Sequence, residues 1–195
     1  MPNTVKSIHS TAIVSRSAEI AKDVQVGPYS VIGPNVKIDS GTWVGAHVVV
    51  EGHTTIGKNN RLFQFASVGS APQDLKYKGE PTLLIIGNSN IIREYVTIQP
   101  GTIQANGKTV VGDGNLFMAS SHVGHDSIVG NGNVFANNVA LAGHVTIQNK
   151  VIIGGMVGIH QFCTIGDHAM LSGGSMVVKD IPPYCIAQGL SLIHI

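Results

Sequence analysis

A medium-sized apolar side chain recurs at every sixth position along most of this 195-residue chain. A period of six matches neither the 3.6-residue repeat of an α-helix nor the two-residue alternation of a simple strand. The first series comprises Ile8, Val14, Ile20, Val26, Ile32, Ile38, Val44, Val50, Ile56, Leu62 and Val68, and resumes at Ile86, Ile92 and Ile98. The second, one residue out of phase, comprises Val111, Phe117, Val123, Val129, Phe135, Leu141, Ile147, Ile153, Ile159, Ile165, Leu171 and Val177. This period predicts a stack of similar short turns.

Small residues alternate with these apolar positions. Gly or Ala often follows the apolar residue directly, as at Gly27 and Gly112, and a small residue often stands four positions after it, as at Ser30 and Cys163. Asn and Asp residues between them are expected to supply the positive φ values that corners demand. These are Asn59, Asn60, Asn88, Asn90, Asp113, Asn131, Asn137, Asn138 and Asn149. The pattern predicts an all-β fold, a parallel β-helix of hexapeptide repeats over residues 1–189.

The composition excludes several classes of function. Twelve Lys and Arg nearly balance 11 Asp and Glu, which argues against a broad polyanion-binding surface and against nucleic acid as a partner. No apolar run approaches the length of a membrane span, and the first residues lack the apolar core of a signal peptide. We therefore expect a cytoplasmic location without stable membrane insertion.

Two breaks in the repeat predict loops that leave the coil. The first covers about 69–85 and contains Gln73, Asp74 and Lys76, whereas the second covers about 99–110 and shifts the phase by one residue. Loops on a rigid scaffold often carry function, although tolerated surface variation is the alternative for either loop. The concentration of polar and charged residues favours function for the first loop only.

The placement of histidines is the second signal. With three hexapeptides to a coil, residues eighteen apart lie above one another at the spacing of paired strands. His125, His144 and His160 are close to that spacing and are expected to form a column at one corner, with Gln161 beside the last. Because strict alternation of side chains fails at a corner, Asp126 could hydrogen-bond to its neighbour His125. A neutral imidazole oriented by a carboxylate is a natural general base for a hydroxyl.

Other interpretations of these histidines remain open. Each could be an ordinary surface histidine. His122 and His125, three residues apart, could instead bind zinc with a histidine from another coil or subunit, as in the β-helical carbonic anhydrases. No third ligand stands out and Asp126 suits a base better, so we expect no metal. A purely structural solenoid, such as an ice-binding one, would need regular exposed ranks of Thr, which the sequence lacks.

Several short motifs occur in a specific order along the chain. They are 63–69 (FQFASVG), 73–77 (QDLKY), 92–98 (IREYVTI), 122–126 (HVGHD), 141–145 (LAGHV), 153–156 (IGGM) and 160–162 (HQF). Together they resemble the UDP-N-acetylglucosamine O-acyltransferase family, and the match extends from about Ile8 to Gly189. Hexapeptides alone are shared with many acetyltransferases, whereas the loop and the histidine motifs in this order are specific.

The resemblance implies a fold and a reaction. The β-helix would be left-handed, which periodicity alone does not show, and the protein would be a homotrimer with active sites between subunits. The reaction would move an (R)-3-hydroxyacyl group from acyl carrier protein to the 3-hydroxyl of UDP-N-acetylglucosamine, the first step of lipid A biosynthesis. No cofactor of the protein's own is implied, because acyl carrier protein delivers the acyl group as a phosphopantetheine thioester.

The resemblance also implies roles for individual residues. His125 matches the general base, Asp126 its orienting partner, and the N–H of Gly143 the oxyanion donor. The matching substrate-binding residues are Asp74 and Lys76 in the loop with Gln73 nearby, and His122, His144, His160 and Gln161 around the sugar and acyl groups. Gly173 matches a residue beside the far end of the acyl groove. Glycine there leaves the groove open and predicts a preference for long donors.

The chain departs from the family pattern in two places. Gln99 precedes Pro100 and Gly101 where many relatives carry a basic residue before the Gly, which weakens the expectation of a phosphate contact there. After residue 189 we expect residues 190–195 to be a short non-native tail, with the family's C-terminal helical domain absent. The alternative within the transferases is the later N-acyltransferase of the same pathway. The 73–77 loop and the His125–Asp126 pair argue against it. That enzyme is also expected to carry an extra N-terminal uridine-binding domain, for which we expect no room in this chain.

Overall fold

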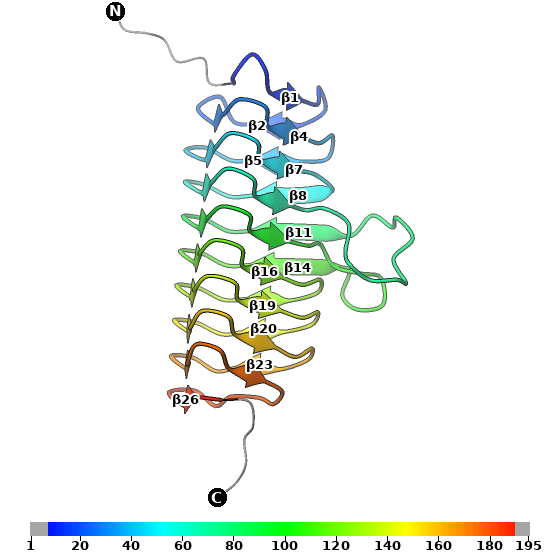
Figure 1. The fold of residues 1–195 in the computed structure, drawn as a ribbon. Coiled ribbons are helices and arrows are strands. Elements are labelled where there is room, and N and C mark those ends of the chain that lie inside the picture. Colours follow the sequence, from blue (N-terminus) through cyan, green and yellow to red (C-terminus); the bar gives the residue numbers. More distant parts are fainter. Residues whose placement is uncertain (1–7, 190–195) are drawn as a thin grey trace, which may run out of the picture.

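The computed structural model describes residues 8–189, and this part of the chain consists of strands and turns without an α-helix. The chain winds into a three-sided stack of coils, in which consecutive strands lie on different sides (Figure 1). The strands on each side form one parallel sheet. The predicted all-β, left-handed parallel β-helix is confirmed. Residues 8–189 include no helix long and apolar enough to cross a membrane.

From β1 to β25 every third strand returns to the same sheet, whereas β26 pairs with β24 and so ends sheet 3. Sheet 1 comprises β1 (Ile13–Val14), β4 (Val31–Ile32), β7 (Val49–Val50), β10 (Ser67–Val68), β13 (Thr97–Ile98), β16 (His122–Val123), β19 (Ala140–Leu141), β22 (Gly158–Ile159) and β25 (Met176–Val177). Sheet 2 comprises β2 (Glu19–Ile20), β5 (Lys37–Ile38), β8 (His53–Ile56), β11 (Leu83–Ile86), β14 (Lys108–Val111), β17 (Ile128–Val129), β20 (Thr146–Ile147) and β23 (Thr164–Ile165). Sheet 3 comprises β3 (Gln25–Val26), β6 (Trp43–Val44), β9 (Arg61–Leu62), β12 (Ile91–Ile92), β15 (Leu116–Phe117), β18 (Val134–Phe135), β21 (Ile152–Ile153), β24 (Met170–Leu171) and β26 (Ile186–Ala187).

The coils stack in register despite the two loops. His122 of β16 pairs with Ala140 of β19, 18 residues further along the chain. Ser67 pairs with Thr97, and Thr97 with His122, although loops lengthen the connections between these strands. The insertions therefore leave the column of strands intact, and residues before and after each loop remain vertical neighbours.

The apolar residues of the six-residue repeat point inward and form one continuous core. Val44, Leu62 and Ile92 are fully buried, and the rings of Phe117 and Phe135 stack with centroids 4.6 Å apart. Burying a side chain of this size stabilises the fold by roughly 1.5–3 kcal/mol. A strictly periodic core holds the external corners in fixed positions, and the candidate site lies on one of these corners.

The prediction that Asn and Asp supply the positive φ values is mostly wrong. Of the nine residues predicted, only Asn59 and Asn138 have positive φ in the described structure. Asn60 and Asn90 are instead fully buried in a ladder with Asn115. The Oδ1 of Asn60 accepts the N–H of Asn90 at 2.9 Å, and the Oδ1 of Asn90 accepts the N–H of Asn115 at 2.9 Å. These side chains satisfy buried backbone groups inside the corner rather than enabling its φ angle.

Aromatic and imidazole rings occupy many positive-φ positions instead. At the corner between sheets 3 and 1, Tyr29, His47, Phe65 and Tyr95 all have positive φ. Their rings stack with successive centroids 5.1, 5.2 and 5.1 Å apart. Stacking between coils helps to offset the cost of a left-handed backbone, which is roughly 1–2 kcal/mol per residue.

Both loops leave the stack at the corner between sheets 1 and 2, and they extend from the same side (Figure 1). The first spans 69–82 and the second 99–107. Each ends before the predicted 85 or 110, because β11 and β14 are four-residue strands in which Leu83 pairs with Lys108. The same corner holds the turn at 124–127 one coil further along, so the loops are neighbours of the predicted histidines.

Candidate active site

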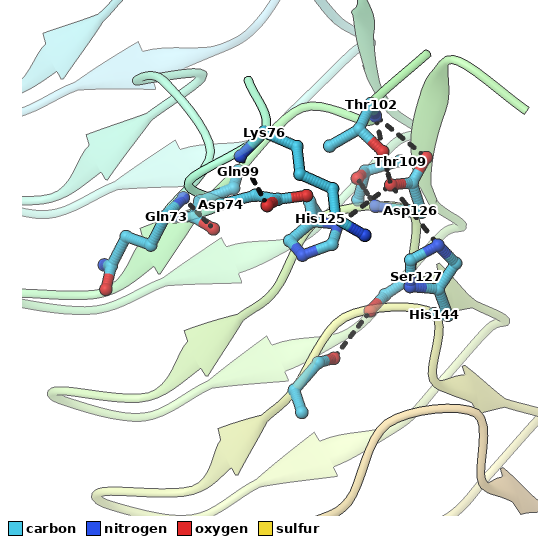
Figure 2. Close-up of polar contacts among 11 residues, drawn as sticks. Gln73, Asp74, Lys76, Gln99, Thr102, Thr109, His125, Asp126, Ser127 and His144 are labelled. Carbon is cyan, nitrogen blue, oxygen red and sulfur yellow. Dashed lines mark hydrogen bonds and ion pairs between the residues drawn. The ribbon is translucent and has the colours of Figure 1, made fainter. Parts of the chain in front are cut away.

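The candidate site lies at the corner between sheets 1 and 2, where the turns after β16, β19 and β22 are stacked. His125 is in the first of these turns and His144 in the second, with ring centroids 5.1 Å apart in an edge-to-face arrangement. Figure 2 shows both rings beside Asp126, with the first loop above them. The corner thus brings together histidines and a carboxylate that the sequence predicts to be functional.

His125 and Asp126 form a hydrogen-bonded pair. The Nδ1 of His125 lies 2.8 Å from Oδ2 of Asp126, and the two side chains are 17% and 2% exposed. Asp126 has a φ of 59°, which breaks the alternation of side chains and allows it to contact its neighbour, as predicted. With Nδ1 donating its proton to the carboxylate, Nε2 keeps a lone pair and can accept a proton.

The carboxylate of Asp126 receives further hydrogen bonds from the second loop. The N–H of Thr102 donates to Oδ1 at 2.9 Å and to Oδ2 at 3.0 Å, and its hydroxyl donates to Oδ2 at 2.7 Å (Figure 2). The backbone N–H of Asp126 itself donates to the hydroxyl of Thr109 at 2.8 Å. Both the carboxylate and the backbone of Asp126 are therefore held in place.

Gly143 lies directly against the ring of His125. A Cβ at this position would lie 2.6 Å from Cε1 and 2.7 Å from Nε2 of His125. The neighbouring amides are occupied, since Ala142 donates to Ile159 and His144 to His125, whereas the N–H of Gly143 donates to no protein acceptor within residues 8–189. A free backbone donor beside a basic nitrogen suits an oxyanion contact.

The expected column of three histidines is only partly correct. Phe162, not His160, continues the stack below His144, with ring centroids 4.6 Å apart. Phe162 follows His144 by a full coil of 18 residues and shares its positive φ, whereas His160 comes two residues earlier in its turn. The Nδ1 of His160 lies 3.2 Å from the carbonyl oxygen of Gln161.

His122 faces outward from β16 beside the pair. Its Nδ1 lies 2.7 Å from the hydroxyl of Thr97, its neighbour in the sheet. Burial lowers the pKa of His122, and the nearby His125 lowers it further. The neutral imidazole is therefore favoured at this position, which suits a hydrogen-bonding role.

Two hollows meet at His125. An apolar groove of about 500 Å³ runs along the outer face of sheet 1, past His122, Ala140 and Gly158 to Met176. A second pocket of about 750 Å³ lies between the loops and the corner. It is lined by Gln73, Asp74, Leu75, Lys76, Thr102, Gln104, Ala105, His125, His144, Gln161 and Phe162. We call these the apolar groove and the polar pocket, and His125 lines both.

The first loop has internal order that fixes its polar residues. The N–H of Gln73 donates to Oε1 of Gln99 at 3.1 Å, which links the two loops. The carboxylate of Asp74 accepts the N–H of Lys76 at 2.9 Å, a local turn that places both residues in the wall of the polar pocket. Gln73 also lines the apolar groove.

Comparisons with known proteins agree with this geometry. A family model described as bacterial transferase hexapeptide (six repeats) matches residues 17–52. The acyl-[acyl-carrier-protein]--UDP-N-acetylglucosamine O-acyltransferase of Stutzerimonas stutzeri (strain A1501) is 50% identical over 182 residues, which are 93% of this chain and 70% of that protein. The chain belongs to the UDP-N-acetylglucosamine O-acyltransferase family. Like other members of this family, it is an acyltransferase.

Solved structures of UDP-N-acetylglucosamine O-acyltransferases superpose closely on this chain. LpxA from Acinetobacter baumannii is 56% identical with a TM-score of 0.93, over 94% of this chain and 71% of that one. The UDP-N-acetylglucosamine O-acyltransferase (LpxA) of Moraxella catarrhalis RH4 is 50% identical with a TM-score of 0.92, over 94% and 71%. Residues 190–195, predicted to be a non-native tail, lie outside the described residues.

The second loop of this O-acyltransferase also borders the candidate site, although the sequence favours function for the first loop only. Thr102 contacts Asp126, and Gln104 and Ala105 line the polar pocket. Sequence reasoning missed Thr102 and Thr109 as partners of Asp126, which they precede by 24 and 17 residues. The phase shift and the Pro100–Gly101 and Asn106–Gly107 pairs signal a loop here, but they do not indicate which residue the loop contacts.

Gly173 lies apart from the other predicted residues of the O-acyltransferase site. It is at the corner between β24 and β25, and a Cβ there would lie 3.3 Å from the carbonyl oxygen of Gly155. It does not line the apolar groove of the single described chain. At that level of the stack Met176 lines the groove, and its Sδ and Cε lie 2.9 and 2.8 Å from where a Cβ of Gly158 would be.

For the alternative of a metal site in this O-acyltransferase, the structure suggests other ligands than the sequence did. His125, Asp126 and His144, rather than the predicted His122 with His125, have potential ligand atoms within 4.8 Å of one another. However, the Oδ2 of Asp126 already accepts hydrogen bonds from His125 and Thr102. This arrangement suits a carboxylate that orients a base better than a metal ligand.

Proposed function

We propose that His125 is the general base of an acyl transfer from acyl carrier protein to the 3-hydroxyl of UDP-N-acetylglucosamine. One observation carries the proposal: His125 lies where the apolar groove meets the polar pocket, with Nδ1 bonded to Asp126. An acyl chain fits an apolar groove, and a sugar nucleotide fits a pocket lined by polar side chains. The reacting atoms would then meet at Nε2 of His125.

The chemistry follows from this arrangement. Nε2 of His125 takes the proton of the sugar hydroxyl as its oxygen attacks the thioester carbonyl carbon, and Asp126 stabilises the imidazolium that forms. The N–H of Gly143 donates to the oxyanion of the tetrahedral intermediate, a contact worth about 3 kcal/mol in comparable enzymes. The carbon–sulfur bond then breaks, and the imidazolium returns its proton to the leaving thiolate. The products are the sugar ester and the free phosphopantetheine thiol, with no covalent acyl-enzyme.

The substrates divide between the two hollows. Asp74 and Lys76 contact the sugar nucleotide from the first loop, with Gln73 nearby, and Gln161 and His144 complete the opposite wall of the polar pocket. The donor acyl group enters the apolar groove from its thioester, so the protein needs no cofactor of its own. A homotrimer with its sites between subunits, partnership with acyl carrier protein and a cytoplasmic location are further parts of the proposal.

Acyl length is the least constrained part of the substrate. Glycine at 173 argues for long donors if a neighbouring subunit completes the groove beside it. Within one chain, the flexible side chain of Met176, which is 49% exposed, lies nearer to the groove than Gly173. Both positions therefore enter the test of chain-length preference.

The decisive experiment is kinetic. His125→Ala should lower kcat by about two to four orders of magnitude, the usual contribution of a general base. Asp126→Asn should be milder, because the geometry persists while the charge that stabilises the imidazolium is lost. Oligomeric state and melting temperature serve as controls, since the His125 side chain contributes nothing to the core. Retention of more than a tenth of the wild-type rate by His125→Ala would refute the assignment.

A further inference from the structure

Thr102 is the main external partner of the Asp126 carboxylate. Its N–H reaches both oxygens and its hydroxyl reaches Oδ2, the oxygen that also accepts Nδ1 of His125. The Asp126 side chain is 2% exposed, so the protein rather than water must supply its hydrogen bonds. Thr102 itself is 1% exposed. The Thr102 hydroxyl is thus buried, and its acceptor is Oδ2 of Asp126.

The second loop is built so that Thr102 meets this carboxylate. The carbonyl of Thr102 accepts the N–H groups of Ala105 at 3.2 Å and Gly107 at 3.1 Å, which folds the loop back on itself. The preceding Gly101 approaches the next strand so closely that a Cβ would overlap the backbone of Lys108. These contacts fix the position of Thr102 independently of Asp126. The same loop forms one wall of the polar pocket.

We propose that Thr102 is a positioning residue that sets the orientation and basicity of His125 through Asp126. The inference rests on the proposed role of His125 as general base. The Thr102 hydroxyl and the His125 imidazole share one carboxylate oxygen, so the hydroxyl withdraws negative charge that would otherwise favour the imidazolium. It also prevents the carboxylate from rotating away from the ring. The second loop therefore couples the wall of the polar pocket to the strength of the base.

The sign of the effect follows from this competition. The other titratable groups around the pair stay in place when the hydroxyl is removed: His144, whose Nε2 lies 3.7 Å from Oδ2 of Asp126, His122 beside His125, and Asp74 and Lys76 in the wall of the polar pocket. Without the hydroxyl, Oδ2 of Asp126 carries more negative charge toward His125, and the imidazolium is better stabilised. The acid limb of the pH–rate profile, where the base loses its proton-accepting form, moves to higher pH. Looser orientation lowers the rate on the plateau as well. Loss of a hydrogen bond to a charged group corresponds to roughly 10- to 100-fold in rate.

The test compares Thr102→Val with Thr102→Ser in the same protein. Valine keeps the shape and both N–H contacts while removing the hydroxyl, and serine keeps the hydroxyl. Thr82→Val is the matched control, because within the described residues the buried Thr82 hydroxyl has no hydrogen-bond partner. The measurements are kcat, KM for UDP-N-acetylglucosamine, the pH–rate profile, and the His125 titration midpoint followed by NMR of labelled histidine.

We expect Thr102→Val to lower kcat by about 10- to 100-fold and to change KM less than threefold. Both the pH of the acid limb of the rate profile and the pH of the His125 titration midpoint should rise. Thr102→Ser should restore the wild-type rate and the wild-type pH dependence, and Thr82→Val should match the wild type in every measurement. An unchanged midpoint and profile in Thr102→Val, or equal damage by serine, would overturn the proposal. A shifted midpoint with an unchanged rate would support the coupling to His125 while refuting His125 as the general base, so the two failures are distinguishable.

Discussion

Substituting Gly143 by Ala should disable His125, the proposed base, while leaving the proposed oxyanion donor, the N–H of residue 143, in place. The added Cβ would lie 2.6 Å from Cε1, 2.7 Å from Nε2 and 3.1 Å from Nδ1 of His125. Ordinary contacts between such atoms are about 3.5–4.0 Å, so the ring must move by roughly 1 Å. Gly143 is not among the positive-φ residues, so alanine imposes no backbone strain and its N–H keeps its direction.

A displacement of this size at a catalytic group costs about 100-fold in rate. Steady-state kinetics should therefore show kcat/KM of Gly143→Ala reduced about 100-fold, with little change in melting temperature because the ring lies outside the apolar core. Gly155→Ala is the matched control, since the nearest atom to its new Cβ is the carbonyl oxygen of Asn137 at 3.4 Å. In a His125→Ala background, Gly143→Ala should add little further loss, because the clash is gone. A Gly143→Ala protein with more than a tenth of wild-type activity would contradict this reasoning.

Three further predictions concern binding, chain length and pH. Asp74→Ala and Lys76→Ala should weaken UDP-N-acetylglucosamine binding in calorimetry with little change in melting, because their loop lies outside the core; equal losses of both would indicate a structural loop. Gly173→Met should shift donor preference to shorter acyl chains, and Met176→Ala should shift it to longer ones. Competition between acyl carrier proteins that carry acyl chains of different length measures this preference, which should change by about 0.8 kcal/mol per methylene. A wild-type preference for short donors would overturn the interpretation of Gly173. Because the folded protein lowers the pKa of His122 below 6.5, the unfolded chain binds more protons there. Stability should therefore fall as pH drops below about 6.5, and His122→Gln should reduce that slope in urea titrations at different pH values; an identical slope would exclude this contribution.

Much of the fold could be predicted because the repeat is short and the same kinds of side chain pack inward in every coil. The six-residue period specifies which side chains point inward, and burial of Val44, Leu62 and Ile92 follows directly from it. The φ angles of the corners could not be predicted in the same way. They depend on stacking between coils, as in the contact of Phe65 with Tyr95, and residue type alone does not report such contacts.

The candidate site was predictable where it depends on sequence neighbours. His125 and Asp126 are adjacent, and a corner is the place where adjacent side chains can meet, so their hydrogen bond could be anticipated. The eighteen-residue coil also brings His144 beside His125. The same spacing did not predict the position of His160 correctly. A shift of two residues within the turn places His160 in the apolar groove, whereas His144 and Phe162 line the polar pocket.

The amino-acid sequence is enough to predict the solenoid, the corner that carries the histidines and the two points at which loops emerge. These features follow from the six-residue period, which recurs in every coil, and from the two places where it is interrupted. The contact of Thr102 with Asp126, the packing of Gly143 against the ring of His125 and the meeting of two hollows at His125 emerge only in the folded chain. The physical reason is that a loop outside the repeat is positioned by its own turn and by contacts with other coils, neither of which a period of six encodes.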